Sequence, residues 1–333
     1  MRTLTVALSL LLPAALAERL PVKSFDTTSG LAHNRVNCIV QTRDGFIWFC
    51  TDDGLSRFDG NAFVNYIGAH GLPHAHVNAM LQSRAGALWL ATDGGLARFE
   101  PFSNSKLFIS FRLPGGEDAQ HINGIAEDHE GTIWCATSGG LFRAIVSGPS
   151  PGFQPVSLDS PTLPYPERSK SHFTSVFVDS SYRIWVGTVR RGAFLRERES
   201  EWRWFGVPHG LPDNFVDTFW EDRSGGVWAG MRRGGAARLE TLPRPPWIAI
   251  REKVPRPALG PEVRAGLVTS DGGLWLAGSG LAHRLPADTT GAFTRKYGPP
   301  SGLTDFTILQ LAEDRDHNQQ FGEKSHDSFP TWV

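Results

Sequence analysis

Long apolar runs are nearly absent from this 333-residue sequence. The one candidate lies at the N-terminus, where Arg2 precedes an apolar core over residues 4–12 and Ala15-Leu16-Ala17 ends the segment. A membrane-spanning helix needs about 20 apolar residues, so the segment is too short to span, and its order is that of a secretory signal peptide. We predict a signal peptide over residues 1–17 and a periplasmic or secreted mature chain.

An excess of charge of one sign is also missing, since 33 Lys and Arg face 34 Asp and Glu and the formal net charge is −1. A balanced chain sets up no field that attracts nucleic acid or an anionic membrane surface. We therefore expect no nucleic-acid partner. A membrane would be involved only if the leader stays uncleaved or if the chain is a fragment of a membrane sensor.

Cysteine is scarce, and three residues are too few for a disulfide framework. Cys38 and Cys50 flank the turn at Arg43-Asp44-Gly45 and fall opposite one another on neighbouring predicted strands. Export would permit a bond between them. A buried cysteine commonly behaves as a small hydrophobic residue, however, so we expect free thiols at both positions. Cys135 has no evident partner.

Tryptophan, by contrast, is abundant and recurs at regular intervals. Residues 44–51 read DGFIWFCT, residues 85–92 read AGALWLAT and residues 130–137 read EGTIWCAT. The recurring tryptophans are Trp48, Trp89, Trp134, Trp185, Trp228 and Trp275. Their separations of 41, 45, 51, 43 and 47 residues suit one four-stranded propeller blade each. Stacking one blade on the next would bury each indole between two sheets.

The predicted fold is an all-β, seven-bladed β-propeller forming a single domain over residues 18–333. The last blade, residues 302–333, is degenerate or truncated because Gln320 stands where a tryptophan is expected and the pattern is lost after Gly322. An N-terminal strand over residues 20–26 would close the ring as the outermost strand of that blade. Two proline-rich stretches, residues 145–170 and 241–261, are interpreted as loops between blades.

The repeat can be written EDxxGxxWxxTxxGLxRF, with a Gly-Leu pair upstream such as Gly30-Leu31 or Gly71-Leu72. It resembles the two-component regulator propeller repeat, and the resemblance covers about residues 20–322. Such repeats build extracytoplasmic sensor regions of bacterial hybrid histidine kinases and of some diguanylate cyclases. The resemblance implies a ligand-binding sensor region without its own output domain, either a natural short form or a fragment of a longer sensor.

In a propeller, the loop before the first strand and the loop between the second and third strands open on the same face, around the channel. The candidate ligand-binding residues come from these loops: His76, His121, His172, Asn78, Asn123, Asp213, Asn214, Arg190, Arg191, Arg232 and Arg233. The two arginine pairs could hold a carboxylated or sulfated saccharide through bidentate contacts. The alternative is that they are solvated loop residues with internal ion pairs.

Three of these candidates, His76, His121 and His172, occupy equivalent positions in neighbouring blades and raise the question of zinc. Equivalent atoms in neighbouring blades lie well apart, whereas zinc–nitrogen bonds are about 2.0–2.1 Å long. We therefore expect no metal and no cofactor. No Ser-His-Asp or paired-carboxylate arrangement stands out, so no catalytic residue is assigned.

The predicted function is that of a sensor propeller for a small molecule or glycan fragment, or for a partner protein. Two alternatives stay open. Streptogramin lyases are seven-bladed propellers with a similar Asp-Gly-x-x-Trp repeat, which would make the chain a metal-dependent lyase. A pure protein-interaction platform is the other, since this fold hosts many functions.

Overall fold

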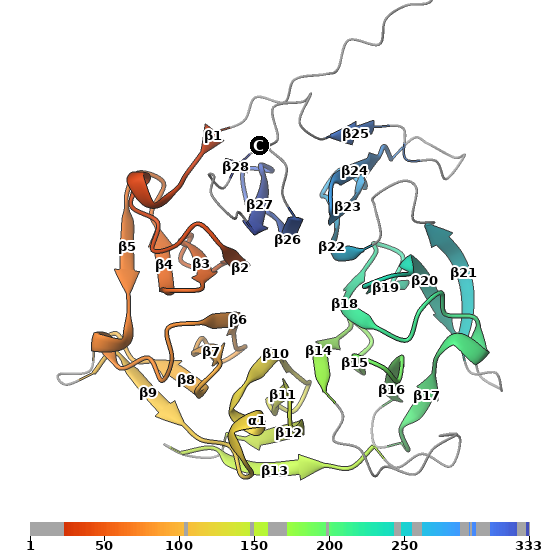
Figure 1. Ribbon diagram of the computed structural model, residues 1–333, viewed down its shortest axis with the longest axis horizontal. Helices are drawn as coiled ribbons and strands as arrows, with labels where there is room; N and C mark the ends of the chain where they lie inside the picture. The colour runs from red at the N-terminus through yellow and green to blue at the C-terminus, as the bar shows by residue number, and fades with distance from the viewer. Residues whose placement is uncertain are drawn as a thin grey trace, which may run out of the picture.

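Each tryptophan-centred repeat folds into one antiparallel sheet, and the sheets stand radially around a common axis (Figure 1). The computed structural model describes residues 23–102, 106–146, 150–158, 172–197, 200–242, 248–254, 262–286, 293, 295–297, 307–324 and 331–332. Six sheets have four strands each, ordered along the chain from the axis outward, and are named blades 1 to 6 here. The all-β propeller fold predicted from the repeat is confirmed.

The strands of each blade follow one another without crossovers. Blades 1 and 2 are β2 (Val36–Gln41), β3 (Ile47–Thr51), β4 (Gly54–Phe58) and β5 (Phe63–Tyr66), then β6 (Val77–Gln82), β7 (Leu88–Thr92), β8 (Gly95–Phe99) and β9 (Phe108–Phe111). Blades 3 and 4 are β10 (Ile122–Glu127), β11 (Ile133–Thr137), β12 (Gly140–Ile145) and β13 (Gly152–Val156), then β14 (Phe173–Val178), β15 (Arg183–Thr188), β16 (Ala193–Glu197) and β17 (Arg203–Phe205). Blades 5 and 6 are β18 (Val216–Glu221), β19 (Val227–Met231), β20 (Gly235–Thr241) and β21 (Ile248–Val254), then β22 (Val263–Val268), β23 (Leu274–Gly278), β24 (Leu281–Arg284) and β25 (Arg295–Tyr297).

A smaller seventh unit lies between blade 6 and blade 1 (Figure 1). It is a two-stranded sheet of β26 (Thr307–Glu313) and β27 (Gln319–Lys324). Close by, β1 (Lys23–Ser24) pairs antiparallel with β28 (Thr331–Trp332), which joins the first and last described strands. The predicted seventh blade is thus not observed as one four-stranded sheet, and residues 301–306 and 325–330 lie outside the described residues.

Short helices connect the blades and explain the recurring Gly-Leu pair. They are η1 (Thr27–Ser29), η2 (Gly68–His70), η3 (Val207–His209) and the α-helix α1 (Glu117–Gln120). The three 3-10 helices end at Gly30, Gly71 and Gly210, whose φ angles of 104°, 102° and 98° favour glycine. The leucine that follows each of these glycines is buried, so the pair combines a turn with an anchor in the core.

The six tryptophans are buried between sheets, as their spacing predicts. Trp48 packs with Val77 and Met80 of blade 2, and Trp275 packs with Ile308 and Phe321 of the seventh unit. The indole nitrogens of Trp134, Trp185 and Trp228 donate to the aspartate six residues earlier, at 2.7, 2.8 and 3.0 Å. In the seventh unit, Nε2 of Gln320 makes the equivalent bond to Asp314 at 2.9 Å, so the polar contact survives where the indole is lost.

A second contact fastens neighbouring blades on the face where each first strand ends. The backbone N–H of the turn donates to the Gln or Glu side chain that ends the first strand of the next blade. We call this contact the turn clamp, and it joins Arg43 to Gln82 (2.9 Å), Arg84 to Glu127 (2.7 Å), Ser180 to Glu221 (2.8 Å) and Ser270 to Glu313 (2.6 Å). Arg315 of the seventh unit reaches Gln41 of blade 1 in the same way at 2.9 Å, so the seventh unit is clamped in the ring.

Two sequence-based expectations are wrong. Cys38 and Cys50 form a disulfide, with Cα atoms 4.9 Å apart, because β2 and β3 place them directly opposite each other. Cys135 is a free, buried thiol. The proline-rich stretches are not simple loops either, since β13 and β21 form the fourth strands of blades 3 and 5 within them. Backbone pairing with the third strand tolerates the single Pro155 on an edge strand.

The predicted signal peptide lies outside the described residues. Across the segments that the structure does describe, no helix is both long and apolar enough to cross a membrane.

Candidate functional site at the channel mouth

Three residues of each blade line one end of the axis, here named the channel mouth. In blade 1 they are Arg35 before the first strand, Asn37 as the second residue of that strand, and Asp52 after the second strand. In blades 2 to 5 a backbone hydrogen bond joins the residue after the second strand to the residue before the first strand. For example, Asp93 N donates to His76 O at 3.3 Å, and Arg232 N donates to Phe215 O at 3.0 Å. The mouth can therefore be compared blade by blade.

The second residue of the first strand docks one blade on the next. Nδ2 of Asn37 donates to the carbonyl oxygen of Val77 at 3.1 Å. Asn78 and Asn123 make the same bond to Ile122 and Phe173 at 2.9 and 2.7 Å, and the Thr174 hydroxyl makes it to Val216. Asn78 and Asn123, predicted as ligand-binding residues, thus have an inter-blade role while also facing the axis.

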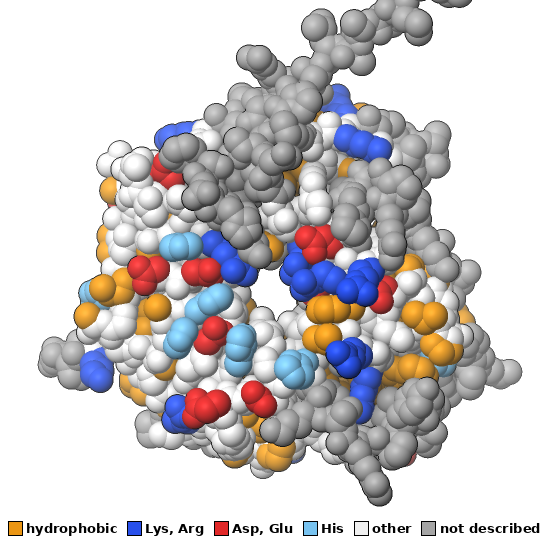
Figure 2. Space-filling model, in the orientation of Figure 1, with side chains coloured by type: hydrophobic (Ala, Val, Ile, Leu, Met, Phe, Trp, Pro, Cys, Tyr) orange, Lys and Arg blue, Asp and Glu red, His pale blue; other side chains and the backbone are white. Residues whose placement is uncertain are grey.

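Blades 1 to 3 join their histidines and acids into a chain along the mouth. Asp52 lies 3.0 Å from His76 Nε2 and 3.3 Å from Arg35 Nη1. Asp93 lies 3.5 Å from His76 Nδ1 and 3.0 Å from His121 Nε2. Figure 2 shows histidine and acidic side chains gathered to the left of the opening, and Lys and Arg side chains on both sides of it, with acidic side chains among those on the right.

Blades 5 and 6 depart from the docking pattern. Asp217 and Arg264 stand where earlier blades have Asn or Thr. Asp217 has no proton to donate to the next blade and instead accepts two bonds from Arg232, at 2.8 and 3.1 Å. Arg264 Nε lies 3.0 Å from Glu262 and 3.8 Å from Asp217. A cluster of four alternating charges thereby replaces simple blade docking.

The electrostatics of this cluster hold Arg232 in its charged form. Partial burial acts to lower the pKa of Arg232, but the hydrogen bonds and charge of Asp217, together with the charge of Glu262, outweigh it and raise the pKa. The guanidinium also lies 4.5 Å from the ring centre of Phe215. Arg232 is thus held in position by Asp217, Glu262 and Phe215 of its own chain.

An open cavity of about 510 Å³ occupies the mouth and the channel below it. Three guanidinium groups line it, from Arg35, Arg232 and Arg264, against the single carboxylate of Asp217. Amide and hydroxyl groups complete a polar lining, and Cys38 of the disulfide also faces the cavity. The carboxylates of Asp52 and Glu262, which pair with Arg35 and Arg264, lie outside this lining. The charged groups that face the cavity are therefore mainly guanidinium groups, and they favour an anion.

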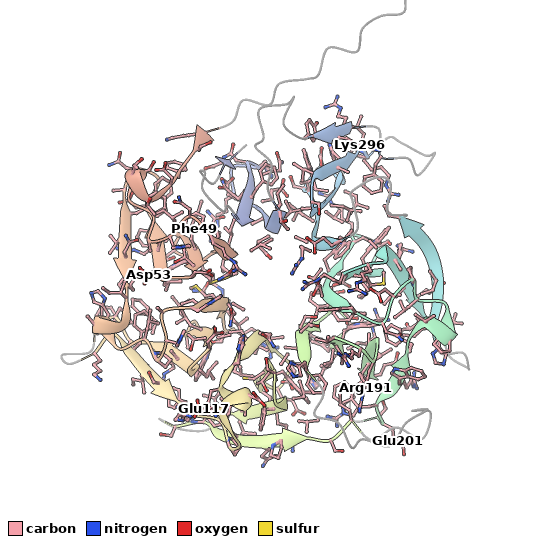
Figure 3. The ribbon with its side chains drawn as sticks, in the orientation of Figure 1. Phe49, Asp53, Glu117, Arg191, Glu201 and Lys296 are labelled. Carbon is pink, nitrogen blue, oxygen red and sulfur yellow. A yellow bond between two sulfur atoms is a disulfide. The ribbon has the colours of Figure 1, made fainter. Side chains whose placement is uncertain are left out.

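The structure brings five of the predicted residues to this cavity: His76, His172, Asn78, Asn123 and Arg232. The others do not line it: His121, Arg190, Arg191, Arg233, Asp213 and Asn214. Arg190 is exposed, and Figure 3 places Arg191 beside β16, outward from the axis. Asp213 and Asn214 accept backbone N–H bonds from Arg233 and Val207, at 3.0 and 2.9 Å. The two arginine pairs therefore do not converge on one anion site.

No group of three His, Cys, Asp or Glu side chains with metal-binding geometry occurs in the described segments. His76, His121 and His172 are not brought to one point, because His76 and His121 each turn to a carboxylate. The prediction that these histidines form no metal site remains a prediction.

Arg264 and Glu262 were not anticipated from the sequence. The signal that could have found them is the succession Asn37, Asn78, Asn123, Thr174, Asp217, Arg264 and Leu309 at one position of the repeat. A side chain that docks one blade on the next recurs at the same position of each repeat. Where a different type of residue stands at that position, the side chain does not dock the next blade.

Comparisons with known proteins match this architecture. The two component regulator propeller model matches residues 30–53. No curated protein matches the chain. Among solved structures, the extracellular domain of the hybrid two component system BT3049 of B. thetaiotaomicron is similar, with a TM-score of 0.72 and 18% identity over 94% of this chain and 41% of that one. The extracellular domain of the hybrid two component system BT4673 of the same organism gives a TM-score of 0.67 and 17% identity, over 93% of this chain and 39% of that one.

A streptogramin B lyase is also similar, with a TM-score of 0.70 and 13% identity over 94% of this chain and 97% of the lyase. Identities this low show the fold alone. The chain spans about two fifths of the length of the two-component neighbours. The resemblance predicted from the repeat is nevertheless confirmed: the chain carries the two-component regulator propeller repeat in a propeller like the extracellular domains of two-component systems.

Proposed function

We propose that this chain is an extracytoplasmic ligand-binding propeller, the input region of a signalling protein, which recognises a small anionic molecule such as a charged glycan fragment. The observation that carries the proposal is the substitution of Asp217 and Arg264 for the docking Asn or Thr. It places fixed charges at a cavity of about 510 Å³, a volume within the usual range of small-molecule sites.

The periplasmic or secreted location is part of the same proposal. It is supported by the residues 1–17 pattern, by the Cys38–Cys50 disulfide, which is typical of oxidising compartments, and by the extracellular neighbours. We also infer that β28 and β1 belong to the seventh unit as its outer strands. The pairing of β1 with β28 and the clamp of Arg315 on Gln41 support a seven-membered ring.

Thermal unfolding in the presence of carboxylated, sulfated and neutral disaccharides tests the proposal. A ligand at a hundredfold excess over its Kd stabilises by about 2.7 kcal/mol, so a specific ligand gives a clear rise in Tm. We expect carboxylated or sulfated disaccharides to raise the Tm and their neutral counterparts to leave it unchanged. A Tm that no anionic saccharide moves, or that neutral and anionic saccharides raise alike, would contradict it.

A lyase is the second candidate, because the streptogramin lyase neighbour is matched over nearly its whole length. A metal-dependent enzyme of that class would lose stability or activity on chelation. Two measurements separate the two candidates: thermal unfolding of the chain, and cleavage of a streptogramin by the chain. Each is made with and without EDTA and added Mg²⁺. Cleavage that EDTA abolishes would favour the lyase and exclude the sensor without enzymatic activity. A partner protein bound at the mouth is the third possibility, and it would compete with the saccharide.

A further inference from the structure

Five side chains form a continuous series of contacts along the channel mouth, from blade 1 to blade 3. In order they are Arg35, Asp52, His76, Asp93 and His121, and each contacts the next, at 3.3, 3.0, 3.5 and 3.0 Å. We call this series the histidine chain. Two of its members, Arg35 and His76, line the cavity at the mouth, and the others lie outside that lining. The histidine chain therefore connects the cavity to charges that surround it.

The hydrogen bonds of His76 depend on its protonation state. Its Nε2 lies 3.0 Å from Asp52 and its Nδ1 lies 3.5 Å from Asp93, so each ring nitrogen faces a carboxylate. The backbone N–H of His76 donates to Nδ1 of His74 at 3.0 Å. A neutral imidazole has one N–H and one lone pair, whereas an imidazolium ion has two N–H groups. Only protonated His76 can therefore donate to both aspartates.

Both aspartates are held in place by neutral groups of the strands beneath them. Nδ2 of Asn37 donates to Asp52 at 2.9 Å, and Nδ2 of Asn78 donates to Asp93 at 2.7 Å. These amides fix the positions of the carboxylates but carry no charge to compensate them. The net charge of the histidine chain is consequently set by its two histidines.

Protonation reverses the sign of that net charge. With both histidines neutral, one arginine faces two aspartates and the net charge of the histidine chain is −1. With both histidines protonated, three cations face two anions and the net charge is +1. Histidine is the side chain that ordinarily changes its charge between about pH 5 and 8. A pH change over this range therefore alters the field at one side of the cavity.

The environment of Arg35 changes with it. Nη1 of Arg35 lies 3.3 Å from Oδ2 of Asp52, and His76 Nε2 lies 3.0 Å from Oδ1 of the same carboxylate. Among the described residues, Arg35 is the one permanently charged cation beside Asp52, and its Nε is buried without a hydrogen-bond partner. An imidazolium ion at His76 shares the charge of Asp52, so less of that charge opposes the attraction of Arg35 for an anion.

We propose that the histidine chain makes anion binding at the channel mouth dependent on pH, and that protonation of His76 and His121 strengthens it. The inference rests on the proposed function, because it concerns the same cavity. Protonation replaces a net negative charge beside the cavity by a net positive one, which attracts an anion instead of repelling it. It also leaves the Arg35 guanidinium, which lines the cavity, less fully compensated by Asp52.

A measurement without ligand tests whether Arg35 responds to the histidines. The Nε–Hε NMR signal of Arg35 in the full chain is assigned by its loss in Arg35→Ala and followed from about pH 8 to about pH 5.5. We expect the signal to move in the wild type and to stay in place in the double variant His76→Gln/His121→Gln. His129→Gln is the matched control, since His129 also lies near an acidic side chain, 3.8 Å from Glu130, but in a turn of the opposite face. A signal that is fixed in the wild type, or that moves equally in the double variant, would overturn the proposal.

Calorimetric titration with digalacturonic acid at the same two pH values tests the effect on binding. The carboxyl groups of this probe stay ionised at both, because ordinary carboxyl pKa values lie near about 4. We expect the wild type to bind about tenfold more tightly at the lower pH, because two charges are added close to the ligand. In the double variant the gain should fall to about twofold, the part that the remaining cavity histidine, His172, supplies. An equal gain in the double variant and the wild type would contradict the proposal.

The two measurements separate this inference from the proposed function. If digalacturonic acid does not bind at either pH while the Arg35 signal still moves, the proposed function fails and the response of Arg35 to the histidines stands. If the acid binds with the same affinity at both pH values and the Arg35 signal is fixed, the proposed function stands and the role of the histidine chain is excluded.

Discussion

The indole of Trp220 occupies the space that any side chain on Gly266 would need: a Cβ there would lie 2.1 Å from Cε2 of Trp220. Trp220 comes from the first strand of blade 5 and Gly266 from the first strand of blade 6. Other blades have medium or large residues at the position of Gly266, such as Ile39, Met80 and Phe219. The joint between blades 5 and 6 also carries Asp217 and Arg264 at the channel mouth, and on the opposite face Val268 stands where the turn clamp has Gln or Glu. The joint therefore departs from the repeat on both faces as well as in its core.

Gly266→Ala is expected to destabilise the chain by about 1–3 kcal/mol, the usual cost of overpacking a core. Adding Trp220→Leu to the Gly266→Ala variant should restore most of the lost stability, because the smaller leucine leaves room for the added methyl group. Leu81 occupies the equivalent position in blade 2. Denaturant unfolding of the two single variants and the double variant measures the coupling. Gly68→Ala, where an added Cβ meets nothing within 4 Å, is the control. Strictly additive effects of the two substitutions would contradict the packing described.

Arg315→Ala is expected to lower the free energy of unfolding by about 1 kcal/mol, the net contribution of a typical hydrogen bond. The guanidinium bonds to the carbonyl oxygens of Thr42 and Arg43 at 3.3 and 2.7 Å, and so ties the seventh unit to blade 1. Arg223→Ala removes the equivalent side chain where no such bond is described, and should change stability little. Equal losses in the two variants would show that the seventh unit is not held in the ring by Arg315.

Thiol counting tests the Cys38–Cys50 disulfide. The native chain should show no reactive thiol towards a disulfide reagent, because Cys38 and Cys50 are bonded and Cys135 is buried. Burial also raises the pKa of the Cys135 thiol to about 12, which leaves almost no thiolate at neutral pH. Unfolding without reductant should expose one thiol, and unfolding after reduction three. Three thiols without reductant would restore the original expectation of free cysteines.

The depressed pKa of Asp222 predicts a pH dependence of stability. Burial opposes the shift, but the bonds from Arg238, Ser224 and Trp228 dominate and lower the pKa below its unfolded value near 3.8. A carboxyl whose folded pKa is depressed stabilises above its unfolded pKa and loses that contribution as the pH falls. Asp222→Asn should therefore have a lower Tm than the wild type at pH 7, and the gap should narrow below about pH 4.

The control for that experiment is Asp316→Asn, which removes an exposed carboxylate of the turn in the seventh unit. Its Tm should follow that of the wild type across the same pH range. A constant gap between Asp222→Asn and the wild type from pH 7 to pH 3 would mean that the ionised form of Asp222 contributes no stability of its own.

The architecture could be predicted from the sequence because its physical cause is local and repeated. Each blade buries one indole against the next, so Trp48 and its counterparts had to recur at the length of a blade. The fourth strand β13 was missed because it is only partly buried and carries little apolar pattern. The strand β21 was missed because it lies within a proline-rich stretch, although Ile248 and Val254 at its two ends are buried. The sequence predicts that Cys38 and Cys50 lie opposite each other on neighbouring strands. It does not predict the bond between them, because these positions also suit two small apolar side chains.

The site was harder to predict because its chemistry lies between blades. Arg232 was identified from its loop, but its neutralisation by Asp217 depends on two strands of one blade meeting at the mouth. Arg264 follows the first residue of a strand and looks like ordinary strand polarity when it is read in its own blade. Comparison of the same position across all units shows it as an exception, and that comparison needs the sequence only.

The charges at the channel mouth are proposed to recognise an anion. Calorimetric titration with digalacturonic acid, and with its neutral dimethyl ester, measures this directly on the wild type, on Arg264→Ala and on Arg190→Ala, whose exposed side chain lies outside the cavity. Binding of the acid but not the ester, weakened about tenfold in Arg264→Ala and retained in Arg190→Ala, is the predicted result. Equal affinity of Arg264→Ala and the wild type for the acid would contradict it.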